Sequence, residues 1–233
     1  MSPAPDELDP HRTTLASYQA NVERYLAGLA AQPSPADAAH LAQFAGLLPA
    51  GAEVLEIGSG PGRDADALES RGLRVRRTDA TAAFVERLRR HGHHAELLDV
   101  LTDQLGGPYD GIWASAVLLH FDREVLADVL GRCRAAVRPA GLLGFSMKEG
   151  DGERWTTAKL DAPRYYVYWR PDELLALVRL AAGVDEPGGG PAGRLVVSDL
   201  PRRAGRRLGH TSRPGDEGIR AGPAIRALSE SRF

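Results

Sequence analysis

A glycine-rich turn between two apolar segments places the strongest constraint on the fold of this chain. Residues 53–57 form a short apolar run, which is followed by Gly-Ser-Gly-Pro-Gly at positions 58–62 and then by a helix-like segment. Glycine lacks a Cβ atom, so it tolerates positive φ angles and lets a ligand approach the backbone closely. The helix that begins after such a turn offers unpaired N–H groups and the positive end of its dipole. The next apolar run ends at Asp79, a carboxylate that can accept hydrogen bonds from ribose hydroxyls. Together these features predict a nucleoside-binding crevice.

Apolar runs and helical patterns alternate along the middle of the chain. We expect strands at 53–57, 73–78, 95–99, 110–115 and 141–147, and helices at 62–70, 81–90, 122–137 and 171–182. Two earlier helices are expected at 13–29 and from Ser34 to about Leu48, where Ser34-Pro35 is a helix-start pattern. Such alternation predicts an α/β fold whose mostly parallel sheet is covered by helices on both faces.

The spacing of the glycines separates two kinds of nucleotide site. A dinucleotide-binding turn has the pattern Gly-x-Gly-x-x-Gly, whereas Gly58, Gly60 and Gly62 occupy alternate positions, with Glu56 two residues before them. A nicotinamide-dependent oxidoreductase would also need a Tyr-x-x-x-Lys pair or an equivalent, and the sequence has none. A tight strand–helix turn that binds no ligand is the other alternative.

Four motifs resemble those of class I S-adenosylmethionine-dependent methyltransferases. The pattern Glu-x-Gly-x-Gly-x-Gly at 56–62 resembles the first motif, and Asp79 matches the acid that ends the second strand. Residues 96–100 match a third strand that ends in an acid, and 109–120 and 138–143 resemble the fourth strand and the turn into the fifth. The resemblance implies a Rossmann-like, doubly wound sheet of seven strands with an N-terminal helical lid. It also implies S-adenosyl-L-methionine as cofactor and S-adenosyl-L-homocysteine as product.

The resemblance further implies a set of cofactor-binding residues. Asp79 is expected to bind the ribose hydroxyls and Asp99 the adenine amino group, while Glu56 orders the turn or holds the cofactor's amino group. Tyr18 and Tyr25 belong to a helix that folds over the cofactor in many members of the family, with ordinary helix packing as the alternative. The full expected set is Glu56, Gly58, Ser59, Gly60, Gly62, Arg63, Asp79, Ala80, Asp99, Val100, Ala114, Ser115, Tyr18 and Tyr25.

His120 is the candidate catalytic residue, because it follows the fourth strand and histidine titrates near neutrality. A role in shaping the pocket or capping the next helix is the alternative. The aromatic and basic residues after the fifth strand fit an acceptor with a ring or a carboxylate, although the alternation there also fits a plain strand. The expected substrate pocket comprises His120, Lys148, Trp155, Arg164, Tyr165 and Tyr166.

The charge and composition of the chain limit the kinds of partner and metal that it is expected to bind. The chain has 233 residues and a formal net charge of -2, so its overall charge offers no attraction for nucleic acid. The apolar stretches are too short for a membrane span, no signal peptide is evident, and we expect a cytoplasmic protein. Cys133 is the single cysteine and is expected to be a buried, inert thiol. His91, His93 and His94 lack further ligands at metal-site spacing, so no metal is expected.

The expected function is methyl transfer, by in-line displacement, to an O or N atom of a small molecule, natural product or short peptide. Secondary metabolism suits this function, since the Asn/Asp-Pro-Pro-Tyr/Phe motif of enzymes that methylate amino groups of bases or glutamine is absent after the fourth strand. A non-catalytic S-adenosylmethionine-binding or regulatory protein is the main alternative. We expect a monomer or homodimer with a tail and lid at 1–48, a cofactor-binding domain at 49–200 and a basic extension at 201–233.

Overall fold

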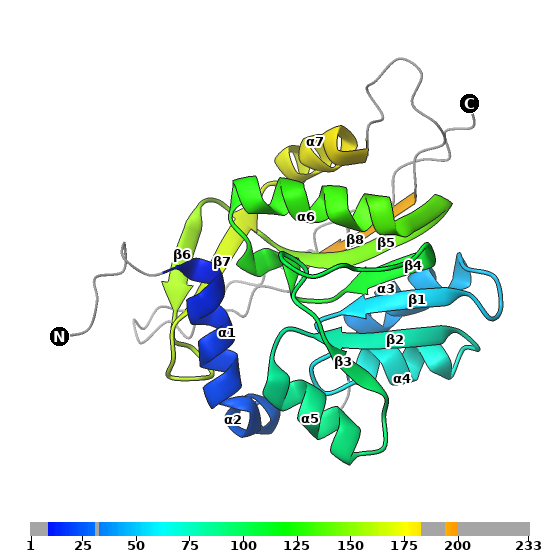
Figure 1. The fold of residues 1–233 in the computed structure, drawn as a ribbon. Helices are drawn as coiled ribbons and strands as arrows, with labels where there is room; N and C mark the ends of the chain where they lie inside the picture. Colours follow the sequence, from blue (N-terminus) through cyan, green and yellow to red (C-terminus); the bar gives the residue numbers. More distant parts are fainter. Residues whose placement is uncertain (1–8, 31–32, 183–193, 200–233) are drawn as a thin grey trace, which may run out of the picture.

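The strands form one sheet in the computed structural model, which describes residues 9–30, 33–182 and 194–199 (Figure 1). Seven strands follow the order β3-β2-β1-β4-β5-β7-β6, and β8 pairs with β5 beside this path. The strands are β1 (Glu53–Ile57), β2 (Arg74–Asp79), β3 (Ala95–Leu97), β4 (Tyr109–Ala114), β5 (Val137–Glu149), β6 (Glu153–Thr156), β7 (Arg164–Trp169) and β8 (Arg194–Asp199). All pairings are parallel except the β6–β7 hairpin. The expected doubly wound, mostly parallel sheet is confirmed.

Helices cover both faces of this sheet (Figure 1). They are α1 (Pro10–Ala20), α2 (Val22–Ala27), α3 (Pro35–Gly46), α4 (Arg63–Glu69), α5 (Ala82–Arg90), α6 (Arg123–Ala136) and α7 (Pro171–Ala182), with a 3-10 turn η2 (Leu118–His120). The pair α6 and α7 packs on one face, and α3 and α4 pack on the other. No helix in the described part of the chain is long and apolar enough to cross a membrane.

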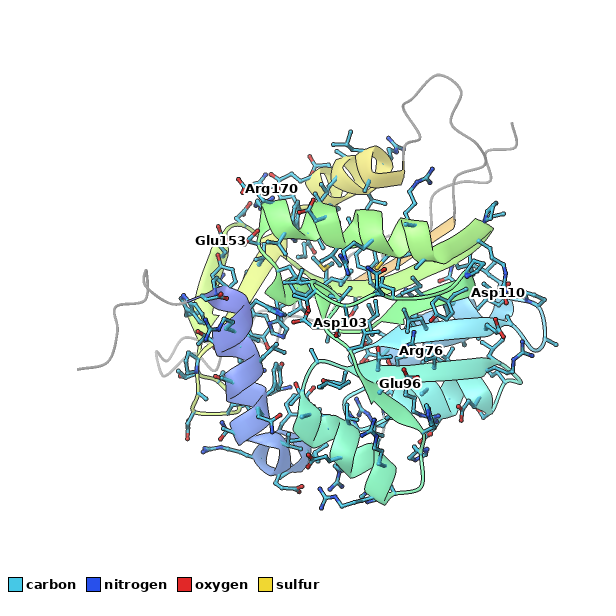
Figure 2. All side chains as sticks on the ribbon, in the orientation of Figure 1. Arg76, Glu96, Asp103, Asp110, Glu153 and Arg170 are labelled. Atoms are coloured by element: carbon cyan, nitrogen blue, oxygen red, sulfur yellow. The ribbon has the colours of Figure 1, made fainter. Side chains whose placement is uncertain are left out.

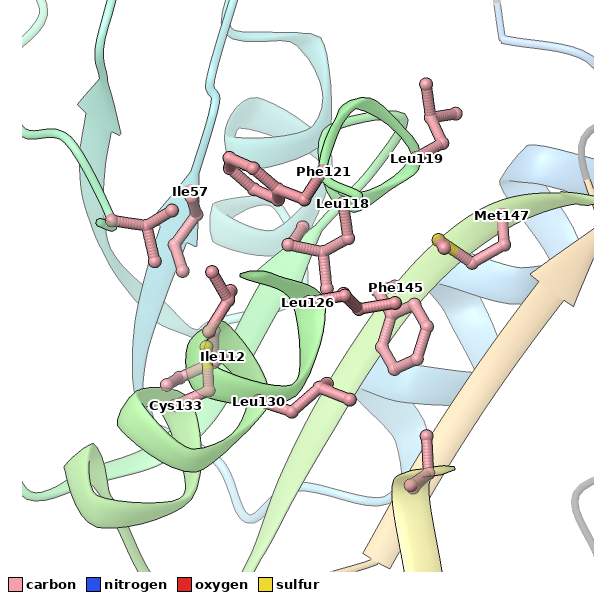
Figure 3. Packing of buried hydrophobic residues seen from close by; sticks show 14 of the residues in the cluster. Ile57, Ile112, Leu118, Leu119, Phe121, Leu126, Leu130, Cys133, Phe145 and Met147 are labelled. Atoms are coloured by element: carbon pink, nitrogen blue, oxygen red, sulfur yellow. The ribbon is translucent and has the colours of Figure 1, made fainter. Parts of the chain in front are cut away.

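Alternation along the central strands divides the core between the two faces. Leu55 of β1 contributes to the cluster under α6, whereas its neighbour Val54 contributes to the cluster under α3 and α4. Figure 3 shows the α6 side, where Leu126 and Leu130 lie close to Phe145 of β5. Cys133 is fully buried in the same cluster, as the sequence predicts, and burial raises the pKa of its thiol to about 12.

The N-terminal helix begins earlier and ends sooner than expected. Asp9 caps α1 by accepting a hydrogen bond from the Arg12 N–H at 2.9 Å, and Pro10 occupies the first turn. The single helix expected over 13–29 is wrong, because the backbone leaves the helical region at Asn21 (φ -132°) and α2 begins after it. Elsewhere Ser34 caps α3, as the helix-start pattern predicts, and Asp122 caps α6.

For the region after the fifth strand, the sequence predicts a polar loop over 148–155, and the family resemblance implies an antiparallel hairpin with strands near 183–186 and at 194–200. Both expectations need correction. The polar segment 148–155 is not one loop, since β5 continues to Glu149 and β6 begins at Glu153. Residues 194–199 do not complete an antiparallel hairpin but run parallel to β5, while the hairpin forms from β6 and β7. The expected partner strand at 183–186 and the basic extension at 201–233 lie outside the described residues.

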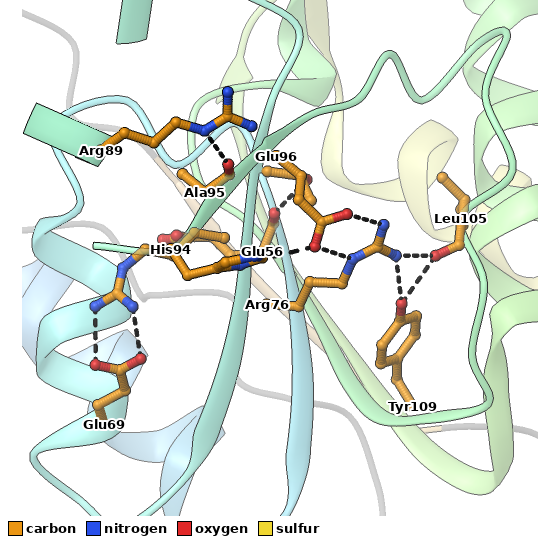
Figure 4. A network of polar contacts seen from close by, with 11 residues as sticks. Glu56, Glu69, Arg76, Arg89, His94, Ala95, Glu96, Leu105 and Tyr109 are labelled. Carbon is orange, nitrogen blue, oxygen red and sulfur yellow. Dashed lines mark hydrogen bonds and ion pairs between the residues drawn. The ribbon is translucent and has the colours of Figure 1, made fainter. Parts of the chain in front are cut away.

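A polar network joins the two outer strands on the β3 side of the sheet. The guanidinium of Arg76 donates two hydrogen bonds to Glu96, at 3.0 and 2.7 Å, and others to the Leu105 carbonyl and the Tyr109 hydroxyl (Figure 4). Asp110 lies at the end of the strands far from α1, which crosses the opposite end (Figure 2). These hydrogen bonds hold β2 and β3 together. The end of the strands beside α1 is the end at which the site lies.

Candidate functional site

A cavity lies at the carboxyl ends of the parallel strands, between the sheet and α1. Its walls come from the turn after β1, the ends of β2, β3 and β4, the turn η2 and the two N-terminal helices. The lining residues are His11, Thr14, Leu15, Tyr18, Tyr25, Ile57, Gly58, Gly60, Asp79, Ala80, Thr81, Phe84, Leu98, Asp99, Val100, Ser115, Ala116, Val117, His120 and Phe121. This is where ligands bind in open α/β sheets.

The glycine turn has the conformation that its composition predicts. Gly58 has φ of +73°, and an added Cβ would lie 2.2 Å from Cγ2 of Val117, so a larger residue would be strained and would collide with Val117. Gly60 has φ of +50°, but an added Cβ would meet nothing within 4 Å. The backbone at Gly60 therefore faces open space in the cavity and allows a ligand to approach closely.

Asp79 joins the turn to the second strand. Its Oδ2 accepts a hydrogen bond from the Gly60 N–H at 2.9 Å, and its Oδ1 accepts one from the Thr81 N–H at 2.8 Å. Burial raises the pKa of this carboxyl above its ordinary value, although both N–H groups favour its charged form. Each oxygen keeps a further lone pair, so the carboxylate can accept from ligand hydroxyls while it holds the turn.

Glu56 lies behind the turn rather than in the wall of the cavity. Its carboxyl is buried and accepts a hydrogen bond from the Ser59 hydroxyl, and burial raises its pKa to about 8. A neutral, buried carboxyl that bonds to the turn supports the turn's shape. Five predicted cofactor residues do not line the cavity: Glu56, Ser59, Gly62, Arg63 and Ala114.

Asp99, at the end of the third strand region, contacts the N-terminal helix. Nε2 of His11 lies 2.7 Å from its Oδ2, and its Oδ1 accepts a hydrogen bond from the Leu101 N–H at 3.0 Å. Burial opposes ionisation of this carboxyl, but these hydrogen bonds outweigh burial and hold its pKa below the ordinary value. Asp99 is thus a charged acceptor in the cavity wall, on which α1 closes through His11.

His120 is held between the hairpin and α1. Its Nδ1 lies 2.6 Å from the carbonyl oxygen of Tyr165, so Nδ1 carries the proton and donates. Nε2 is then an acceptor, and the Tyr18 hydroxyl lies 3.2 Å from it. Burial, with Arg164 nearby, lowers the pKa of His120 to about 4, which keeps the imidazole neutral at pH 7. The histidine is a neutral hydrogen-bond acceptor that faces the cavity.

Aromatic residues of α1 and α2 close one side of the cavity. The rings of Tyr18 and Tyr25 meet edge to face with centroids 5.3 Å apart, and Tyr25 packs against Phe84 in the same way at 5.7 Å. Burial raises the pKa of Tyr25 to about 12, so its hydroxyl stays protonated. Both tyrosines line the cavity, Tyr18 from α1 and Tyr25 from α2.

The residues predicted for the acceptor pocket divide between two faces of the β6–β7 hairpin. Tyr166 packs against His120 with ring centroids 4.7 Å apart, and the cationic groups of Arg164 and Lys148 each lie 5.3 Å from the Tyr166 ring. Trp155 and Tyr165 form a cross-strand pair, which places their rings on the face opposite to that of Tyr166. The structure therefore brings Lys148, Arg164 and Tyr166 together with His120, next to the cavity.

Several lining residues were not predicted from the sequence. Three of them, His11, Thr14 and Leu15, belong to the first turns of α1. Asp9-Pro10 is a helix-start pattern and is the signal that would have extended the helix to His11. The other unpredicted lining residues are Ile57, Thr81, Phe84, Leu98, Ala116, Val117 and Phe121. Except for Thr81, they are apolar or small residues, whose type alone does not indicate ligand binding.

Comparison with known proteins agrees with this geometry. Residues 55–143 match a protein-family model described as a methyltransferase domain, and this range contains the glycine turn, Asp79, Asp99 and His120. A comparison with curated protein sequences finds no significant match.

Solved structures show the same fold. The 1,6-didemethyltoxoflavin-N1-methyltransferase of Burkholderia thailandensis, solved with its namesake compound and S-adenosylhomocysteine, is 24% identical with a TM-score of 0.55. That match covers 78% of this chain and 81% of the other. The CcbJ methyltransferase of Streptomyces caelestis is 18% identical with a TM-score of 0.56, over 75% of this chain and 88% of the other. DhpI in a complex with SAH is 23% identical with a TM-score of 0.62, over 74% of this chain and 87% of the other.

Proposed function

We propose that this chain, a class I S-adenosylmethionine-dependent methyltransferase, transfers the methyl group to an O or N atom of a small molecule, natural product or short peptide. One observation carries the proposal: the glycine turn, Asp79 and Asp99 line a single cavity that also contains His120. The compound named for the Burkholderia thailandensis structure is a small molecule, which supports an acceptor of that size. Residues 49–200 would form the cofactor-binding domain, with α1 and α2 as its lid.

The residues of the cavity fit S-adenosyl-L-methionine. The open space at Gly60 admits a ligand against the backbone, and Asp79 and Asp99 offer acceptors for ribose hydroxyls and for the adenine amino group. Leu98 and Val100 provide apolar surface for the adenine ring beside Asp99. When bound, the cofactor supplies an electrophilic methyl carbon on a sulfonium. The protein's part is then to align the acceptor and exclude water.

His120 is the residue positioned to take a proton from the acceptor. Its neutral imidazole presents Nε2 to the cavity side, and the carbonyl of Tyr165 fixes that tautomer. The Tyr18 hydroxyl occupies Nε2 in the structure, so an acceptor hydroxyl or amine would have to replace it or pass its proton through it. A pKa of about 4 makes His120 a weak base, suited to an acceptor that loses its proton as the methyl bond forms.

Calorimetric titration with S-adenosyl-L-methionine, S-adenosyl-L-homocysteine and NADH tests the cofactor first. Micromolar binding of the two adenosyl ligands without NADH binding is the expected result. NADH binding in their place would support an oxidoreductase, and binding of none would make the glycine turn purely structural.

Methyl transfer from radiolabelled cofactor to a panel of small hydroxyl, amine and carboxylate compounds tests the reaction. In the His120→Ala variant we expect cofactor affinity to be unchanged and transfer to fall by about 100-fold. A fall of less than about threefold would leave His120 as a pocket residue without a role as base. Tight cofactor binding with no transfer to any compound would favour the regulatory alternative.

A further inference from the structure

Two cationic side chains next to the cavity have no acidic partner within the described residues. Arg164 has only 2% of its surface exposed, and its guanidinium donates to two neutral oxygens, the Tyr18 hydroxyl and the Ala158 carbonyl. Its Nε is buried, and no described residue accepts a hydrogen bond from it. Lys148 is half-buried and faces the same Tyr166 ring as Arg164. Burial and the charge of Arg164 together lower the pKa of Lys148.

A second buried arginine shows how this protein normally compensates such a charge. Arg77 is 5% exposed and donates hydrogen bonds to Glu69 at 2.6 and 2.8 Å and to Asp66 at 2.7 Å. Burying an ion without a counter-charge is strongly unfavourable, so a buried guanidinium beside a lysine destabilises the protein unless an anion binds there. Two adjacent cations that repel each other point to a negative charge that the described residues do not supply.

We propose that the acceptor carries an anionic group, a carboxylate or a phosphate-type oxyanion, that binds between Arg164 and Lys148. This inference rests on the proposed function, because it specifies the acceptor class for the same site. Tyr18 connects the two cations with the cavity, since it lines the cavity and accepts from Arg164 at 3.1 Å. An oxyanion is a stronger acceptor than a neutral hydroxyl and would replace Tyr18 on Arg164.

Displacement of Tyr18 has a second consequence at His120. The same hydroxyl contacts Nε2 of His120, so its departure frees that nitrogen for the acceptor. Binding of the anion and exposure of the candidate base are thereby coupled through one tyrosine. An uncharged acceptor would leave Tyr18 in place and both cations without a counter-charge from the described residues.

The test is calorimetry on the full chain with three probes of similar shape: benzoate, phenylphosphonate and benzamide. Each is titrated with and without saturating S-adenosyl-L-homocysteine, and binding of that cofactor product is measured separately. We expect one of the two anions to bind at least about tenfold more tightly than benzamide, because hydrogen bonds to charged groups contribute that much. The probe that binds distinguishes carboxylate from phosphate-type recognition.

Variants assign the effect to the two cations. Arg164→Gln and Lys148→Met should each remove the preference for the anion, whereas Arg170→Gln should keep it. Arg170, labelled in Figure 2, is a matched control. It follows β7 directly, but its side chain is exposed and pairs with Asp151. Should Arg164→Gln misfold by its melting curve, Lys148→Met still decides the question.

Two outcomes would overturn the inference: equal affinity for benzamide and the anions, or an anion preference that survives both substitutions. Either result leaves the proposed methyl transfer intact if S-adenosyl-L-homocysteine binds. If that compound does not bind, the proposed function fails, and the titrations without it still report on the anion site.

Discussion

Asp79 combines two tasks in one carboxylate, because it accepts N–H groups from the glycine turn and from the loop after β2, and it faces the cavity. We predict that Asp79→Asn weakens S-adenosyl-L-methionine binding by about 1.5–3 kcal/mol, since a charged acceptor is replaced by a neutral one. Calorimetry measures the loss. The expected control is Asp110→Asn, which also removes a carboxylate that accepts a backbone N–H but lies at the far end of the strands (Figure 2). Equal weakening in both variants would assign the effect to general destabilisation.

A comparison of Gly58 with Gly72 distinguishes the energetic cost of backbone strain from the cost of overpacking. Both have positive φ angles, +73° and +83°, but an added Cβ collides with Val117 at Gly58 and meets nothing within 4 Å at Gly72. Gly72→Ala should lower the free energy of unfolding by about 1–2 kcal/mol through strain alone. Gly58→Ala should cost about 1–3 kcal/mol more because of overpacking. Urea denaturation of both variants gives the difference, and equal losses would show that Val117 moves aside freely.

At the scale of elements, α1 crosses the carboxyl ends of the strands and closes one side of the cavity. Its contact with the strand ends includes the pair between His11 and Asp99, whose side chains are 22% and 21% exposed. We predict that His11→Ala speeds hydrogen exchange of the α1 amides by up to about fivefold, which is the effect of losing one partly exposed hydrogen bond to a carboxylate. Amides of α6 should not change. His94→Ala is the control, because that side chain is 86% exposed, and the prediction fails if both variants exchange alike.

The elements also show what the sequence can predict. Strands β1, β2 and β4 and the helices after them were predicted to within a residue or two, because buried apolar runs and helical periodicity leave local signals. The same local signals identify the glycine turn, Asp79 and Asp99 of the cavity wall. The contact of His11 with Asp99 was not predictable, since it joins residues far apart in the chain through the packing of α1. The break at Asn21 and the position of β8 beside β5 likewise depend on tertiary contacts.

For the whole molecule, two buried groups set opposite dependences of stability on pH. Glu56 keeps its proton in the folded state up to a pKa of about 8 but loses it near 4.5 when unfolded, so its contribution falls as pH rises between these values. His120 takes up a proton near 6.5 when unfolded but near 4 when folded, so its contribution rises with pH over that range. The two slopes oppose each other from about pH 4.5 to 6.5, and Glu56 acts without that opposition above 6.5.

The free energy of unfolding should therefore be nearly level from pH 5 to 6.5 with respect to these groups and then fall by about 1.5 kcal/mol by pH 8, because the slope of about 1.4 kcal/mol per pH unit decreases as pH approaches the pKa of Glu56. Asp79, whose pKa is also raised by burial, changes stability in the same direction as Glu56. In Glu56→Gln the fall above pH 6.5 should disappear, because the amide carries no proton to lose. Urea denaturation at pH 6.5, 7.25 and 8 measures the free energy of unfolding. Glu53→Gln, on the same strand but with a half-exposed side chain paired to Arg74 and Arg138, should retain the fall. If Glu56→Gln keeps the wild-type slope, Glu56 is ionised in the folded protein, and the glycine turn then rests on a buried negative charge.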